Sequence, residues 1–187
     1  MPSKCRAFSA IASLVLLALA SPVARAQSRV GSDSSSRVNR YWHDLGYGAA
    51  LGFVYAGIDQ ARDEPKEWGR DASGYGKRLA SNVGEFVIQE SVTDGLAAVM
   101  NRPLDYQHCT CHDTGGRIGW ALASAVTDPL PGGHRALAVP RIVGAYAGSF
   151  AQASWLPATS NRLQTAIVNG TTSLLIGAAI NLFYELR

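Results

Sequence analysis

Residues 163–184 read LQTAIVNGTTSLLIGAAINLFY, a run of 22 residues without a charged side chain. Small residues recur at every fourth position of this run, and residues four apart share one face of a helix. Ala166 with Gly170, and Ser173 with Gly177, therefore form two adjoining stripes without bulky side chains, and large apolar residues cover most of the remaining circumference. A helix that is apolar nearly all round belongs at the centre of a bundle or in lipid.

The same spacing of small residues recurs in other parts of the chain. Glycine inside a helix costs roughly 0.5–1 kcal/mol relative to alanine, so repeated glycines require a compensating gain. Close approach of two helix backbones supplies such a gain. We therefore expect eight glycines to be helix-packing positions: Gly48, Gly52, Gly76, Gly84, Gly144, Gly148, Gly170 and Gly177.

Clusters of proline and glycine divide the chain into segments that are long enough for helices. Proline removes a backbone donor and disfavours helix in the residue before it, which makes these clusters natural breaks. No segment shows the alternation of apolar and polar residues that is typical of strands. The sequence predicts an all-α fold, a compact bundle of about five helices packed through Gly/Ala faces, over residues 40–61, 71–100, 117–126, 140–155 and 161–186.

The first 26 residues have the organisation of a secretory signal peptide. Lys4 and Arg6 precede an apolar run over residues 10–20, and Ala24-Arg25-Ala26 follows as a cleavage site, which predicts cutting before Gln27. Residues 27–38 are polar and rich in serine, so we expect a flexible tether there and a helical domain over residues 39–187. The predicted destination is the periplasm or cell envelope.

Charge and motif content exclude several classes of function. The whole chain holds 17 basic and 14 acidic residues, and loss of Lys4, Arg6 and Arg25 with the signal peptide leaves 14 of each. A neutral chain without a run of basic residues does not suit a phosphate backbone, so we expect no nucleic acid as a partner. The chain has no Gly-x-Ser-x-Gly elbow, Walker loop or His-Glu-x-x-His motif. We therefore assign no reaction and no catalytic residue.

The most chemically distinctive segment is His108-Cys109-Thr110-Cys111-His112. Thiolate and imidazole groups bind zinc and copper, so a metal site formed by His108, Cys109, Cys111 and His112 is one hypothesis. The spacing differs from the Cys-x2-Cys of structural zinc sites, and a disulfide is the plainer alternative in an oxidising compartment. Thiol-redox exchange is the third alternative. The cofactor that these four residues suggest is zinc or copper.

Two carboxylates, Glu90 and Asp94, fall on the apolar stripe of the helix predicted over residues 71–100. Acids on such a face either have raised pKa values or are paired with cations. A structural pair would use an arginine later in the chain: Arg117, Arg135 or Arg141. The alternative is acid–base chemistry or a path for protons or ions. A separate polar row is interpreted as a solvated face: Asn82, Glu85, Gln89 and Thr93.

Motifs spread over most of the mature chain carry a family resemblance. They are Pro65-Lys66-Glu67-Trp68-Gly69, Gly74-Tyr75-Gly76-Lys77-Arg78, Asn82-Val83-Gly84, Gly144-Ala145-Tyr146, Trp155-Leu156-Pro157 and the spaced residues Ser173, Leu174, Gly177, Asn181, Phe183 and Glu185. This pattern resembles a family of uncharacterised bacterial exported proteins. The resemblance implies a helical fold, a signal peptide and no assigned activity, so it transfers no catalytic residue.

Residues 142–161 and 163–184 are both free of charge and, as helices, long enough to cross a bilayer. We expect an exported helical protein of the cell envelope that is associated with a membrane and has a structural or interaction role. The expected partners are a second copy of the chain, another envelope protein or the lipid bilayer. The alternative function is a metal-binding or thiol-redox module built on residues 108–112.

Overall fold

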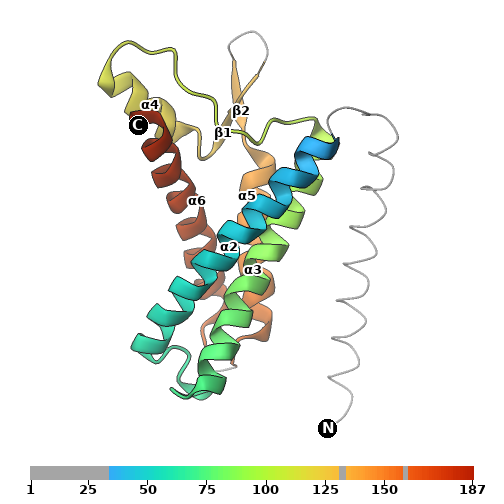
Figure 1. Ribbon diagram of the computed structural model, residues 1–187, viewed down its shortest axis with the longest axis vertical. Helices are drawn as coiled ribbons and strands as arrows, with labels where there is room; N and C mark the ends of the chain where they lie inside the picture. The colour runs from blue at the N-terminus through green and yellow to red at the C-terminus, as the bar shows by residue number, and fades with distance from the viewer. Residues whose placement is uncertain (1–33, 131–133, 158–159) are drawn as a thin grey trace.

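The computed structural model describes residues 34–130, 134–157 and 160–187 (Figure 1). Each of its five described α-helices overlaps a segment that the sequence predicts as helical, so the expected all-α bundle is confirmed. The elements are α2 (Ser34–Arg62), η1 (Lys66–Trp68), α3 (Ala72–Met100), α4 (Thr114–Ala123), β1 (Thr127–Pro129), β2 (Arg135–Leu137), α5 (Val139–Trp155) and α6 (Arg162–Leu186).

Two features of the chain differ from the sequence prediction. Strands β1 and β2 pair in antiparallel register, with Thr127 opposite Leu137, where no strand is expected. Three residues per strand are too few for alternation to become visible in the sequence. Helix α2 begins at Ser34, so residues 34–38 of the predicted tether are helical. The rest of the tether and the predicted signal peptide lie outside the described residues.

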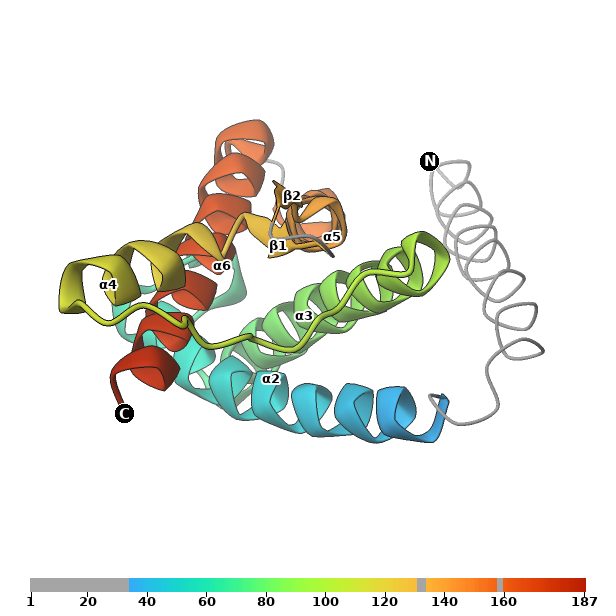
Figure 2. The same ribbon diagram turned by 90° about the horizontal axis from the view of Figure 1, so that it is seen from above.

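Helix α3 lies between α2 and α5, and α6 packs against α5 and α4 (Figures 1 and 2). Figure 1 shows α6 diverging from the α2–α3 pair toward its C-terminal end, where α4 lies beside it. A cleft opens on the side of α6 that faces the α2–α3 pair. This cleft is the candidate functional site.

Glycine allows the backbones of α3 and α5 to approach each other closely. A Cβ atom added at Gly148 would lie 2.7 Å from the carbonyl oxygen of Glu85, and one at Gly144 would lie 2.8 Å from that of Gln89. Non-bonded heavy atoms pack favourably at about 3.5–4.0 Å, so neither position has room for a methyl group. The predicted backbone-to-backbone packing is confirmed for this helix pair.

At three other glycines, a large side chain of the neighbouring helix occupies the space. Phe86 of α3 fills the notch at Gly48 of α2, and Val83 would lie 2.9 Å from a Cβ atom at Gly52. The ring of Tyr146 on α5 would lie 2.6 Å from a Cβ atom at Gly170 of α6. These three positions are helix-packing positions as predicted.

The remaining predicted packing glycines behave differently. A Cβ atom at Gly84 would make ordinary contact with Trp155, at 3.6 Å. At Gly76 and Gly177 an added Cβ atom would meet nothing within 4 Å, so the packing prediction is wrong for these two. Gly76 is exposed on α3, and Gly177 lines the cleft beside α6.

The distribution of large and small side chains is unusual for a helical bundle. In the described part of the chain, the buried side chains of hydrophobic type are all alanine. The largest buried side chains are polar or charged, among them Arg78, Glu185 and Asp128. Twenty-four large apolar side chains are instead exposed by 36% to 66% of their area, which leaves the bundle with a small and polar interior and a large apolar exterior.

The connection between α2 and α3 is organised around the buried side chain of Arg78. Its guanidinium donates to the carbonyl oxygens of Glu64 at 2.7 Å, Pro65 at 3.0 Å and Gly69 at 2.6 Å, and to the side-chain amide oxygen of Gln60 at 2.6 Å. Pro65, Gly69 and Arg78 belong to the motifs that carry the family resemblance. These motif residues therefore form one structural unit that fixes the α2–α3 hairpin.

Candidate functional site

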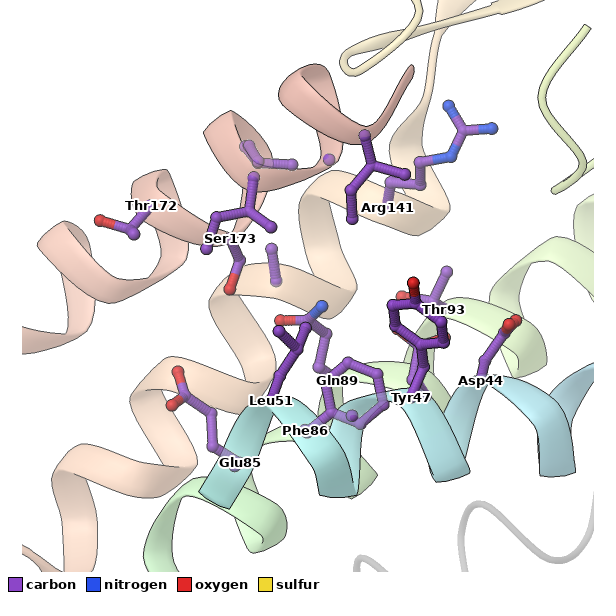
Figure 3. Close-up of a pocket in the computed structure, with 18 of the residues that line it drawn as sticks. Asp44, Tyr47, Leu51, Glu85, Phe86, Gln89, Thr93, Arg141, Thr172 and Ser173 are labelled. Atoms are coloured by element: carbon purple, nitrogen blue, oxygen red, sulfur yellow. The ribbon is translucent and has the colours of Figure 1, made fainter. Parts of the chain in front are cut away.

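A cleft of about 470 Å³ lies between α6 and the α2–α3 pair, with α5 behind it (Figure 3). Its volume falls within the range of roughly 300–1,000 Å³ that is typical of ligand sites. The lining combines apolar, hydroxyl, amide and carboxylate groups from four helices, which include Asp44, Tyr47, Leu51, Glu85, Phe86, Gln89, Thr93, Arg141, Thr172 and Ser173.

The wall of the cleft contributed by α6 includes a row of small and polar residues, and the opposite side of this helix is apolar. Asn169, Ser173 and Gly177 follow one another at four-residue intervals along the cleft. Val168 and Leu175, which project in roughly the opposite direction at 100° per residue, are 53% and 65% exposed. Helix α6 thus turns a row of small and polar residues toward the cleft and carries an exposed apolar surface on its opposite side.

A chain of side-chain hydrogen bonds connects the four long helices below the cleft. Asn169 of α6 donates to Gln152 of α5 at 2.7 Å, Gln152 donates to Asn82 of α3 at 3.0 Å, and Asn82 donates to Asp59 of α2 at 3.1 Å. Gln152 and Asn82 each accept one hydrogen bond and donate another within this chain. Asn169, at the end of the chain, contributes one donor bond. Single amides inside the small-residue helices are the one signal of this chain in the sequence, and they do not reveal which helices they join.

The polar row of α3 is not a solvated face, which corrects the sequence interpretation. Asn82 joins the amide chain, Thr93 is buried near Gly144, and the hydroxyl of Ser149 donates to Glu85 at 2.7 Å. Burial raises the pKa of Glu85, and the bond from Ser149 opposes this rise. The row faces α5 and the cleft, so its polarity serves helix packing and the lining of the cleft.

Glu90 and Asp94 lie on the side of α3 that faces α2, but the predicted arginine partners are wrong. Asp94 pairs with Arg40 of α2 at 3.1 Å, and Arg40 also contacts Asp105 at 3.2 Å. Glu90 lines the cleft. Burial raises the pKa of Glu90 to about 7, and the negative charge of Asp94 adds to the rise. Burial also raises the pKa of Asp94, while Arg40 opposes that change.

The three arginines expected near these acids have other partners. Arg141 pairs with the buried Asp128 at 3.2 Å, and Arg135 lies over the Trp120 ring with its guanidinium carbon 3.9 Å from the ring centroid. Arg117 donates to Glu185 at 3.0 Å. The three arginines connect α4, the β1–β2 hairpin and the start of α5, because their partners lie in these elements and at the end of α6.

Glu185 is a buried acid that the sequence analysis placed only in a motif. Its carboxylate accepts from the hydroxyl of Tyr106 at 2.7 Å, from the backbone N–H of Cys109 at 3.0 Å and from Arg117. These donors hold the pKa of Glu185 at about 2, with the bond from Tyr106 as the largest cause. The end of α6 therefore anchors the irregular segment 101–113 that connects α3 and α4.

Cys109 and Cys111 form a disulfide within this segment, with Cα atoms 5.1 Å apart. The imidazole Nδ1 of His108 lies 3.4 Å from the Glu185 carboxylate, and His112 is exposed. Among residues 34–130, 134–157 and 160–187, no group of three or more His, Cys, Asp or Glu side chains is placed to hold a metal ion. The arrangement matches the disulfide alternative, and zinc or copper binding stays a prediction.

Of the helices in the described part of the chain, α6 alone is long and apolar enough to cross a membrane, with 17% of its most apolar window buried. The second charge-free run of the sequence does not form one such helix, because α5 ends at Trp155, two residues before Pro157. Comparisons with protein-family models, curated proteins and solved structures give no match to this chain. The family resemblance therefore stays a prediction.

Proposed function

We propose that this protein is an exported protein of the cell envelope that associates with a membrane and has a structural or interaction role. In this proposal its outward apolar side chains contact lipid. The cleft beside α6 supports the interaction role, because it has the volume of a ligand site and carries polar groups from four helices. No reaction is assigned, since none of the constellations described above combines a nucleophile, a base and a stabilising group.

The observation that supports the proposal best is the inverted distribution of side chains. A water-soluble bundle buries its Leu, Ile, Val and Phe residues because their removal from water drives folding. In the described part of this chain none of those residues is fully buried and many are exposed, whereas alanine, glycine and hydrogen-bonded polar groups are buried. Small residues and interhelical hydrogen bonds are what hold helices together when the surrounding solvent is lipid. In a lipid environment, the exposed apolar side chains would not have to contact water.

Helix α6 provides the clearest surface for this association. Its outer side carries Val168, Leu175, Phe183 and Leu186, each between 47% and 65% exposed. Its charge-free length is bounded by Arg162 and Glu185. Burial of one large aliphatic or aromatic side chain contributes about 1.5–3 kcal/mol, so a few of these residues provide enough energy for stable attachment.

The test is the distribution of the protein between cell fractions. We expect the mature chain to be recovered with membranes and to remain there after a carbonate wash, which removes proteins held by charge alone. Recovery of the protein wholly in the soluble periplasmic or culture fraction would contradict the proposal. Signal-peptide removal is checked in the same samples by the mass of the chain.

A pair of matched variants on α6 identifies the surface responsible. Leu175→Lys places a charge on the outer side, whereas Ser173→Lys places the same charge on the side of the cleft, about 160° around the helix at 100° per residue. Lysine is expensive at a lipid-facing position. We expect Leu175→Lys to lower the fraction that survives the carbonate wash, while Ser173→Lys leaves it near the wild-type value. Equal effects of the two variants would argue against lipid contact through this side of α6.

A further inference from the structure

The disulfide between Cys109 and Cys111 contributes little as a cross-link. Its two cysteines are already joined through a single intervening residue, so the bond closes a very short loop. Disulfides that restrict the unfolded chain most are those that close long loops. This disulfide also connects no two elements of secondary structure, because both cysteines lie between α3 and α4.

The segment around the disulfide is held in place by atoms other than sulfur. The backbone N–H of Cys109 and the hydroxyl of Tyr106 donate to Glu185 at 3.0 Å and 2.7 Å. The indole N–H of Trp120 donates to the carbonyl oxygen of Gln107 at 2.8 Å. None of these contacts uses a sulfur atom, so cleavage of the sulfur–sulfur bond removes none of them directly.

The two sulfur atoms are not equivalent. The backbone N–H of Cys111 donates to Sγ of Cys109 at 3.1 Å, and His108 adjoins Cys109 in the chain. A donor aimed at one sulfur stabilises negative charge there, which makes that sulfur the better leaving group in thiol–disulfide exchange. Both cysteines are partly exposed and are flanked by the exposed residues Thr110 and His112. An incoming thiol therefore has access to the pair.

We propose that Cys109 and Cys111 form a redox-active pair that exchanges with the thiols of other exported proteins. A thiolate of a substrate dithiol attacks Sγ of Cys111, the sulfur–sulfur bond breaks, and its electron pair leaves on Sγ of Cys109. The second substrate thiolate then attacks the substrate sulfur of this mixed disulfide, and Cys111 leaves as a thiolate. Two electrons pass from the substrate to the pair, and the protons lost by the substrate thiols protonate the two cysteines.

This activity is independent of the proposed membrane association, because it uses the loop between α3 and α4 and not the outer side of α6. The reduced pair returns to the disulfide by the same exchange with a low-molecular-weight disulfide such as oxidised glutathione. An exported chain meets such oxidants in a compartment where disulfides persist.

The experiment measures exchange directly on the purified mature chain, in detergent if the protein requires it. The probe is a synthetic peptide with two thiols, and its oxidation is followed by mass spectrometry in the presence of oxidised glutathione. We expect the wild-type protein to accelerate peptide oxidation at least tenfold over the Cys109→Ser, Cys111→Ser double variant. Thr110→Ser, which keeps both thiols, is the matched control and should retain the wild-type rate.

The single variants test the order of attack. Cys109→Ser removes the thiolate that can return to Sγ of Cys111 and expel the bound peptide. With a peptide that has a single thiol and cannot resolve the adduct itself, Cys109→Ser should therefore accumulate a peptide adduct on Cys111 several-fold more than Cys111→Ser accumulates one on Cys109. If the serine variants fail to fold, wild-type protein that has been reduced and alkylated replaces them. A rate equal to that of the alkylated protein would overturn the proposal. Unfolding on reduction, or stoichiometric zinc binding by the reduced protein without exchange, would also overturn it.

Discussion

The close contact between α3 and α5 predicts opposite effects for the same substitution at two glycines. In Gly148→Ala, the new methyl group would lie 2.7 Å from the carbonyl oxygen of Glu85 and 2.9 Å from Cβ of Gln89. Relief of these contacts requires the two helices to separate by about 0.8 Å, since non-bonded atoms prefer separations of about 3.5 Å or more. A backbone carbonyl within a helix has no rotamer through which to yield, so the strain falls on the whole interface.

The magnitude follows from two opposing effects. Insertion of a methyl group into a filled interface costs about 1–3 kcal/mol, and replacement of glycine by alanine within a helix returns roughly 0.5–1 kcal/mol. Gly148→Ala should therefore lower the free energy of unfolding by about 1 kcal/mol, and by up to about 2.5 kcal/mol if the interface cannot adjust. Gly177→Ala meets nothing within 4 Å and should raise it by roughly 0.5–1 kcal/mol.

The assay is denaturant unfolding of both variants and the wild type in the same buffer and detergent, followed by far-UV circular dichroism. If the free energy of unfolding falls with denaturant concentration at the same slope in all three proteins, the variants differ in stability and not in the surface exposed on unfolding. The reasoning is refuted if the two substitutions change stability in the same direction by similar amounts. Such a result would mean that α3 and α5 do not meet at Gly148.

Three further predictions concern buried charges. The pKa of Glu90 is raised to about 7, so the folded state holds the proton of this carboxyl more tightly than the unfolded state does. The free energy of unfolding should therefore fall as pH rises from about 4.5 to 7, by on the order of 3 kcal/mol. Unfolding measured at several pH values should show that Glu90→Gln removes this dependence on pH. The pKa of Glu185 is lowered to about 2, so its contribution is present above about pH 4.5 and is lost as pH falls toward 2; Glu185→Gln should speed hydrogen exchange in residues 101–113 at neutral pH. Arg78→Met should destabilise the fold by about 3–5 kcal/mol, measured by denaturant unfolding, because it leaves buried acceptors without their charged donor.

The helices were predictable because their signals are local. Proline clusters and long segments with few breaks locate all five described helices, and the cap at Asp113, whose carboxylate accepts from the N–H of Gly116, explains why α4 begins before the predicted residue 117. The β1–β2 hairpin was not predictable, since Thr127–Pro129 and Arg135–Leu137 are too short to show an alternation of apolar and polar residues. Local patterns therefore determine where helices occur but do not reveal very short strands.

The site residues depend on pairings between distant parts of the chain, which periodicity does not encode. The four-residue spacing marks a small face at both Gly148 and Gly177, but only the fold decides that one meets α3 and the other the cleft. The same holds for Asp94, whose partner Arg40 lies 54 residues earlier in the chain. Burial of the acids was predictable from the stripe on α3, whereas the identity of the cation was not.

The composition of the interior limits where the stability of this fold comes from. An alanine side chain offers one methyl group, and burial contributes only about 0.8 kcal/mol per such group, so the alanine interior supplies little hydrophobic energy. The chain of hydrogen bonds from Asp59 to Asn169 adds order across four helices, yet each bond has a net value of about 0.5–1.5 kcal/mol in water. Large apolar residues such as Leu175 and Phe183, which are 65% and 63% exposed, would contribute far more if a lipid or a partner covered them. The proposed lipid contact would therefore couple the fold energetically to its surroundings, and the outer surface of α6 is where that coupling should be strongest.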